Sequence, residues 1–175
     1  MRDRYVVDTN VLIAASAAHP LHPKDIDATP AEPELRLMVW RWLTEFETGM
    51  SRLVLDYRWG IRKEYERNLT PGDYGIQVLQ SKWDKAQVDF VAVEYDSDDC
   101  GVLPASLLPI IHDTDDRKMV AAALASHADF GEGCVAFAGD TDWHDWEEAL
   151  AKHEILLEPI IEAWSRQKHA EKKQR

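Results

Sequence analysis

The chain of 175 residues contains little cysteine: only Cys100 and Cys134 occur, and neither stands in a Cys/His ligand spacing. Two isolated cysteines exclude a disulfide-stapled scaffold and a cysteine-rich zinc site. Long apolar runs are missing too. No uncharged stretch approaches the ~18 residues of a membrane-spanning helix, and no apolar targeting segment opens the chain. We therefore expect a cytoplasmic protein with no membrane partner.

Positive charge is also scarce. Lys and Arg number 20 against 32 Asp and Glu, so the formal net charge is −12. This balance excludes a protein held on nucleic acid by a broad basic surface, because such binding depends on Lys and Arg at the phosphates. It does not exclude an enzyme that meets nucleic acid through bound metal ions, since the cations neutralise the site locally. The acidity also suits a basic partner protein.

The segments that are present alternate between short apolar runs and amphipathic stretches. This alternation predicts an α/β protein with a Rossmann-like central parallel sheet of about five strands flanked by helices. We expect one domain over 1–166, a proline-rich loop over 19–33 and a charged, flexible tail over 167–175. The expected strands are 5–7, 51–56, 88–95, 134–138 and 155–157, and the expected helices include 34–46, 57–69, 74–86, 112–125, 146–153 and 159–165.

Two of the expected strands end in acids. The run Tyr5-Val6-Val7 leads into Asp8, and the strand over 134–138 leads through Gly139 into Asp140. Parallel strands deliver their carboxyl ends to one edge of the sheet, where ligands of such folds bind. Acids in or before helices, at Glu64 and at Asp113, Asp115 and Asp116, can join them there. A cluster of carboxylates with no nitrogen or sulfur ligand suits Mg²⁺ or Mn²⁺.

The acids also lie in motifs that resemble those of PIN-domain ribonucleases. The resemblance covers nearly the whole chain, with four motifs in the family's order. It implies a PIN-type Rossmann-like fold and a metal-dependent endonuclease that cuts single-stranded RNA. The motifs are Val6-Val7-Asp8-Thr9-Asn10-Val11-Leu12, Glu64-Tyr65-Glu66-Arg67-Asn68-Leu69, the segment from Asp113 to Leu124, and Val135-Ala136-Phe137-Ala138-Gly139-Asp140-Thr141-Asp142.

By this resemblance, Asp8, Glu64, Asp116 and Asp140 are the catalytic acids and hold one or two Mg²⁺ or Mn²⁺ ions. The usual position of the third acid falls at or beside Arg117. We favour Asp116, one residue earlier, and Asp113 and Asp115 stay open as alternatives. Supporting roles fall to Thr9, Asn10 and Asp142. Asp8 also has a simpler interpretation as the cap of the helix that follows it.

The substrate side is less specific. Arg117 and Lys118 stand beside the third acid and are candidates for contacts with RNA phosphates. Trp143 and Trp146 follow Asp140 and are the better candidates among the tryptophans for stacking on bases. Two biological settings fit the resemblance: the toxic half of a toxin–antitoxin pair, with an antitoxin as the basic partner, or an effector in a defence locus. A homodimer is also open.

Two alternatives use the same acids differently. A catalytically quiescent PIN-like module would bind RNA or a partner protein without cutting, and the uncertain third acid keeps this hypothesis open. A phosphoacceptor receiver domain also gathers acids and Mg²⁺. That class requires an Asp ending the third strand and a late Lys, whereas the third strand here ends in Glu94-Tyr95-Asp96 and no Lys lies between Cys134 and Asp140.

Overall fold

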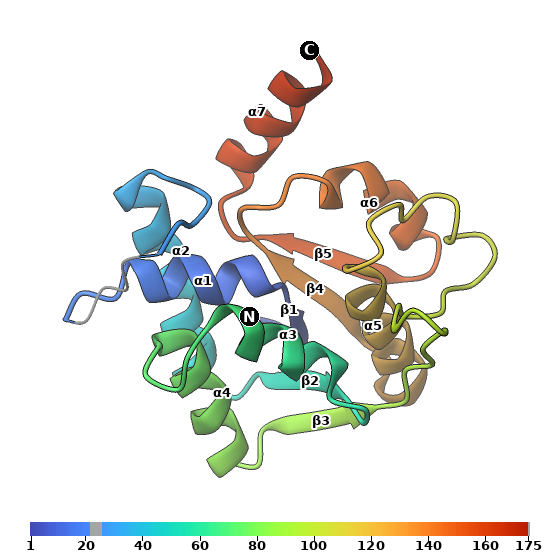
Figure 1. Ribbon diagram of the computed structural model, residues 1–175, viewed down its shortest axis with the longest axis horizontal. Helices are drawn as coiled ribbons and strands as arrows, with labels where there is room; N and C mark the ends of the chain where they lie inside the picture. Colours follow the sequence, from blue (N-terminus) through green and yellow to red (C-terminus); the bar gives the residue numbers. More distant parts are fainter. Residues whose placement is uncertain (22–25, 175) are drawn as a thin grey trace.

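Within residues 1–21 and 26–174, which the computed structural model describes, the centre is a five-stranded sheet (Figure 1). Its strands are β1 (Arg4–Val7), β2 (Arg52–Asp56), β3 (Val88–Val91), β4 (Gly133–Phe137) and β5 (Ile155–Pro159). They lie in the order β3-β2-β1-β4-β5, and each neighbouring pair is parallel. The prediction of a Rossmann-like α/β fold with about five parallel strands is confirmed.

The described part of the chain also contains seven helices; α7 projects away from the sheet, and the others flank it (Figure 1). Figure 1 shows α1 to α4 gathered on one side and α5 with α6 on the other. This division follows from right-handed crossovers, because the chain moves outward from β1 to β3 and then returns to β4 on the other side. The helices are α1 (Thr9–Ala17), α2 (Pro33–Thr48), α3 (Gly60–Asn68), α4 (Tyr74–Asp84), α5 (Arg117–Phe130), α6 (Trp143–Ala151) and α7 (Glu162–Lys173).

Helices on both faces explain the composition of the central strands. Every residue of β4 is buried, and so are the last three residues of β1. Strands covered on both sides are continuously apolar and do not alternate between apolar and polar residues. Cys134 lies in β4 as a buried free thiol, and Cys100 is also free. None of the described helices is long and apolar enough to cross a membrane.

Several expected boundaries were wrong. Strand β3 ends at Val91, four residues before the predicted end, because the following segment leaves the sheet and makes only an isolated bridge between Tyr95 and Gly101. Helix α2 begins at Pro33, where the proline-rich stretch ends. The described parts of that stretch, 19–21 and 26–32, contain neither helix nor strand, as predicted. Its residues 22–25 lie outside the described residues.

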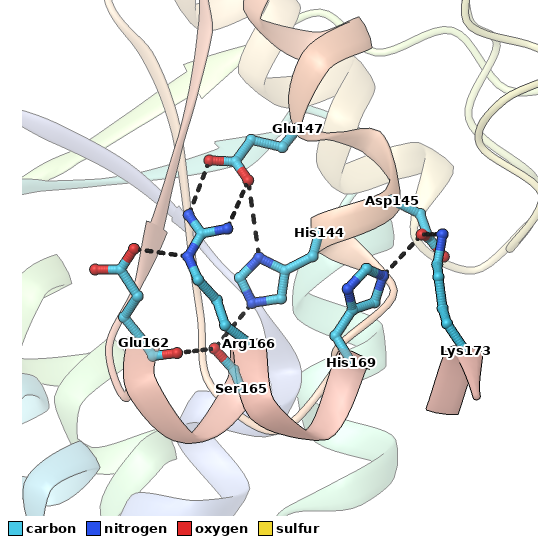
Figure 2. A network of polar contacts seen from close by, with 8 residues as sticks. All are labelled: His144, Asp145, Glu147, Glu162, Ser165, Arg166, His169 and Lys173. Atoms are coloured by element: carbon cyan, nitrogen blue, oxygen red, sulfur yellow. Dashed lines mark hydrogen bonds and ion pairs between the residues drawn. The ribbon is translucent and has the colours of Figure 1, made fainter. Parts of the chain in front are cut away.

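The last helix extends through most of the segment that we expected to be a flexible tail. Helix α7 runs on to Lys173, and polar side chains attach it to α6 (Figure 2). Arg166 reaches both carboxylate oxygens of Glu147 at 3.1 Å, and Nε2 of His169 lies 2.8 Å from Asp145. The expected end of the last helix at residue 165 was wrong, because a charged composition also describes a helix whose partners lie on a neighbouring acidic helix.

Candidate metal centre

Asp8 and Asp140 follow the two strands between which the strand order reverses. Val7 of β1 is in register with Ala136 of β4, and the backbone N–H of Asp8 donates to the carbonyl of Ala136 at 2.9 Å. Asp140 follows β4 after a short turn. The carboxyl ends of strands at such a switch point form the crevice in which α/β sheets bind ligands. The structure thus places both strand-end acids where the sequence predicted them.

Asp8 is buried without full compensation for its charge. The residue is 2% exposed, and its Oδ2 atom is buried with no hydrogen-bond partner. Asp8 stands at the N-cap position of α1, as the simpler interpretation expected, but its side chain makes no capping hydrogen bond of ordinary geometry. Burial, followed by the charges of Asp140 and Glu64, raises the pKa of Asp8 well above the ordinary value. Polar groups of Asn10 act in the opposite direction.

Asp116 and Asp140 belong to the same electrostatic cluster. Asp116 immediately precedes α5 and is 8% exposed. Burial raises its pKa, and the neighbouring charges of Asp8 and Asp140 raise it further. Burial also raises the pKa of the partly buried Asp140, although its Oδ1 accepts the backbone N–H of Asp142 at 2.8 Å. The charge of Asp140 therefore acts on both Asp8 and Asp116.

Glu64 reaches the cluster from α3, which is tied to the end of β1. The buried Tyr65 hydroxyl donates to the carbonyl of Val7, the residue before Asp8. This bond fixes the rotation of α3, and the adjacent Glu64 carboxylate then accepts the hydroxyl of Thr9 on Oε1. Its second oxygen, Oε2, lies 2.6 Å from Nζ of Lys118. Thr9 therefore lies in contact with one of the four candidate acids.

The four acids form a possible set of ligands for a divalent cation. Four carboxylates supply oxygen atoms only, and the buried, unpartnered Oδ2 of Asp8 is the kind of atom that a bound cation would satisfy. This chemistry fits Mg²⁺ or Mn²⁺. Among the described residues, however, no three His, Cys, Asp or Glu side chains are already grouped closely enough to hold one ion. One of the four carboxylates, Glu64, is paired with the ammonium of Lys118.

The remaining acidic candidates have local partners. Oδ1 of Asp113 accepts the backbone N–H of Asp115 at 2.9 Å, which shapes the turn before α5. The charge of Asp113 nevertheless raises the pKa of both Asp116 and Asp140. The side chain of Asp115 is exposed. Among the three acids of this turn, Asp116 is the one that burial brings into the cluster.

Asp142 connects the site to the C-terminal helix. Its carboxylate forms an ion pair with Lys172 of α7, and Nε2 of His112 lies 3.7 Å from its other oxygen. Burial raises the pKa of Asp140, and the nearby Lys172 charge opposes that rise. The C-terminal helix therefore carries a positive charge to the rim of the acid cluster, a contribution that no motif in the sequence signals.

Three residues that the sequence offered for substrate contact, Arg117, Trp143 and Trp146, make other contacts within the protein. The Arg117 guanidinium donates to the carbonyl of Ile111 at 3.1 Å and to that of Leu108 at 3.5 Å, so it holds the loop before α5. The stacking prediction for Trp143 and Trp146 was wrong, since both are 0% exposed. They pack edge to face with ring centroids 5.1 Å apart, because the amphipathic helix α6 turns them toward the core.

A polar pocket of about 270 Å³ adjoins the cluster on the side of α3. Lys118 and Asp115 form the wall that it shares with the acids. Lys63 and Arg67, one helical turn apart on α3, are exposed and make no ion pair with any described residue. The full lining is Arg58, Gly60, Lys63, Arg67, Tyr95, Asp98, Asp99, Cys100, Asp115 and Lys118.

One strand-end acid was not singled out from the sequence. Asp56 ends β2 at the same edge of the sheet and is fully buried. Its two oxygens accept the backbone N–H groups of Gly60 and Ile61, each at 2.9 Å, at the start of α3. This acid is structurally satisfied, and it positions the helix that carries Glu64.

Comparisons with protein-family models, with curated proteins and with solved structures found no match to this chain.

Proposed function

We propose that the chain is a metal-dependent endoribonuclease that hydrolyses phosphodiester bonds of single-stranded RNA with Mg²⁺ or Mn²⁺. The observation that carries this proposal is the gathering of three acids at the switch point of the sheet, where Asp8 and Asp116 are buried, Asp140 is partly buried, and the buried Oδ2 atom of Asp8 has no hydrogen-bond partner. Structural acids in protein interiors are paired or hydrogen-bonded, whereas a cluster of unpaired acids becomes favourable when a divalent cation binds. The resemblance of the four sequence motifs to PIN-domain ribonucleases supports RNA as the substrate.

Asp8, Asp116 and Asp140 would hold the ion, with Glu64 on the side of α3. When bound, such an ion supplies an activated water and stabilises the departing oxygen of a phosphodiester. The chain's own groups do the positioning. The hydroxyl of Thr9 orients the Glu64 carboxylate, and the backbone N–H of Asp142 holds Asp140. The exposed Lys63 and Arg67 line the adjoining pocket and provide positive charge for neighbouring phosphates.

A second candidate function is favoured by the ion pair between Lys118 and Glu64. In a catalytically quiescent module, this lysine would permanently take the place of the metal ion, and the domain would bind RNA or a protein without cutting. The two candidates differ in RNA cleavage: the nuclease cuts RNA and requires a divalent cation to do so, whereas the quiescent module binds RNA or a protein without cutting.

The test is cleavage of end-labelled single-stranded and structured RNAs by the purified chain in Mg²⁺ or Mn²⁺. We expect cleavage that EDTA abolishes. Asp8→Asn, Asp116→Asn and Asp140→Asn should each lower the rate at least about a hundredfold, the usual size of the loss when a group that stabilises the transition state is removed. Asp129→Asn is the matched control, since Asp129 is an exposed acid at the far end of α5.

Cleavage that is equal in wild type, in the three variants and in EDTA would refute the nuclease proposal, because the activity would then come from a contaminant. RNA binding that is unaffected by EDTA, with no cleavage in either metal, would favour the quiescent module.

A further inference from the structure

Lys118 is a buried cation in the middle of an acidic site. The residue is 7% exposed, and its ammonium lies 2.6 Å from Oε2 of Glu64. The same nitrogen donates to the backbone carbonyl of Asp115 at 2.7 Å. Both partners are negative or partially negative, so the ammonium is fixed from two sides at the edge of the acid cluster.

The backbone around Lys118 is fixed as well. A Cβ atom added at Gly101 would lie 2.7 Å from both the Cα and the backbone nitrogen of Lys118. The loop at Gly101 therefore packs directly onto the first turn of α5, and no larger residue fits between them. Because the stem of Lys118 starts from this constrained turn, the ammonium is positioned before any ligand arrives.

Direct ion pairing with the acids of the cluster is limited, among the described residues, to this contact. Within the described residues, Lys118 is the only cation in an ion pair with one of the four acids Asp8, Glu64, Asp116 and Asp140. Lys172 approaches from α7 but pairs with Asp142, and its side chain is largely exposed. The ammonium of Lys118 thus occupies a place where a metal ion that used Glu64 would need to be.

We infer that Lys118 is an internal counter-cation of the acid cluster, which a divalent ion must displace from Glu64 before that carboxylate can become a ligand. The inference rests on the proposed function, since it takes Glu64 as a ligand of the ion. Competition between the ammonium and the ion would set the metal affinity, and the metal-free protein would keep its acids assembled through Lys118. Lys118 is therefore a positioning residue that acts through Glu64.

The test is a calorimetric titration of wild type and of Lys118→Met with Mn²⁺ at pH 7.5 and moderate salt. We expect Lys118→Met to bind Mn²⁺ about tenfold more tightly, a change that corresponds to about 1.4 kcal/mol of lost competition. In EDTA, the same variant should melt at a lower temperature than wild type, because the partly buried Glu64 carboxylate then lacks its partner. Saturating Mn²⁺ should reverse that difference.

Lys63→Met is the matched control, because Lys63 precedes Glu64 on α3 but is exposed and solvated. Solvent and salt screen such a charge, so we expect less than about a twofold change in Mn²⁺ affinity. Equal or weaker Mn²⁺ binding by Lys118→Met than by wild type would overturn the inference, as would an equal gain in both variants.

A second measurement uses the wild-type protein alone and does not depend on the folding of a variant. The ¹H–¹⁵N spectrum of the lysine ammonium groups should show a slowly exchanging signal from Lys118 in EDTA, and that signal should move or disappear on addition of Mg²⁺. A signal that is unchanged by saturating Mg²⁺ would overturn the inference, as would a failure of both wild type and Lys118→Met to bind either metal. If the metal ion displaces Lys118 as expected but the protein does not cleave RNA, the proposed function is refuted and the inference about Lys118 stands.

Discussion

Replacing Asp8 by Asn should make the metal-free protein more stable while it removes metal binding and activity. The side chains are nearly equal in size, so the substitution changes the charge and leaves the packing intact. In the folded protein the carboxylate is buried near the charges of Asp140 and Glu64, and its Oδ2 atom has no partner. A neutral amide avoids this repulsion and can donate to the neighbouring carboxylates.

The magnitude follows from the pKa of Asp8, which rises from 3.8 to about 8. Each unit corresponds to about 1.4 kcal/mol of difference between the charged and neutral forms. At pH 7 the Asp8 carboxyl is ionised in the unfolded chain and largely protonated in the folded protein. The interval from its ordinary pKa of 3.8 to pH 7 therefore sets an upper bound of about 4 kcal/mol on the free energy that burial of Asp8 costs the folded state. Water penetration and relaxation reduce such costs, and we expect Asp8→Asn to gain about 1–3 kcal/mol.

The assay is urea unfolding in EDTA at pH 7.5 and again at pH 5. The gain should be largest at pH 7.5 and shrink at pH 5, where the unfolded-state carboxyl approaches its own pKa. Asp56→Asn is the control. The Asp56 carboxylate accepts two backbone N–H groups at 2.9 Å, so this variant should lose about 1–2 kcal/mol under the same conditions. Addition of Mn²⁺ should stabilise wild type and Asp56→Asn but not Asp8→Asn.

A loss of stability in Asp8→Asn at pH 7.5 in EDTA would show that the carboxylate is compensated in the folded protein. The argument for a metal centre would then lose its main support. A gain of equal size at both pH values would show that the effect comes from packing and not from charge.

Two further predictions concern the same edge of the sheet. Mn²⁺ affinity should increase as the pH rises from about 5 to 8, because Asp8, Asp116 and Asp140 all have raised pKa values and must lose protons to bind the ion. Over the same range the metal-free protein should lose stability, since the folded state holds more protons than the unfolded state; calorimetry and urea unfolding at several pH values measure the two trends, and flat profiles would contradict them. Gly139→Ala should cost about 1–3 kcal/mol and weaken Mn²⁺ binding, because a Cβ there would lie 2.3 Å from the carbonyl oxygen of Thr29 and displace Asp140. Gly72→Ala, where a Cβ meets nothing within 4 Å, should stay within about 0.5 kcal/mol of wild type in thermal unfolding.

The sequence was sufficient for the sheet and for the strand-end acids because both depend on local patterns. Apolar runs of strand length separated by amphipathic segments predict parallel strands, and this fold brings their carboxyl ends to one edge. Asp8 and Asp140 could therefore be expected at the same edge of the sheet without any knowledge of the strand order. The observed register of Val7 with Ala136 supplies the detail that no sequence pattern contains.

The sequence was insufficient where a side chain's partner lies far away in the chain. Lys118 is a candidate for phosphate contact by its position beside Asp116, yet its partner is Glu64, 54 positions earlier. Trp143 and Trp146 follow an acid of the site, but helix rotation sends them into the core. Lys172 belongs to a charged segment, and only the tertiary structure brings it to Asp142. In each case the direction of a helix face decides the role.

Asp8 and Asp56 differ in how the fold satisfies their carboxylates. Both end neighbouring parallel strands, and both are buried. The two oxygens of Asp56 are satisfied by the first N–H groups of α3, so its charge stabilises that helix. Asp8 has an equivalent opportunity at the start of α1 but makes no cap, and one oxygen stays buried without a partner. This contrast between the two strand-end acids supports the proposal that a positive ligand binds at Asp8.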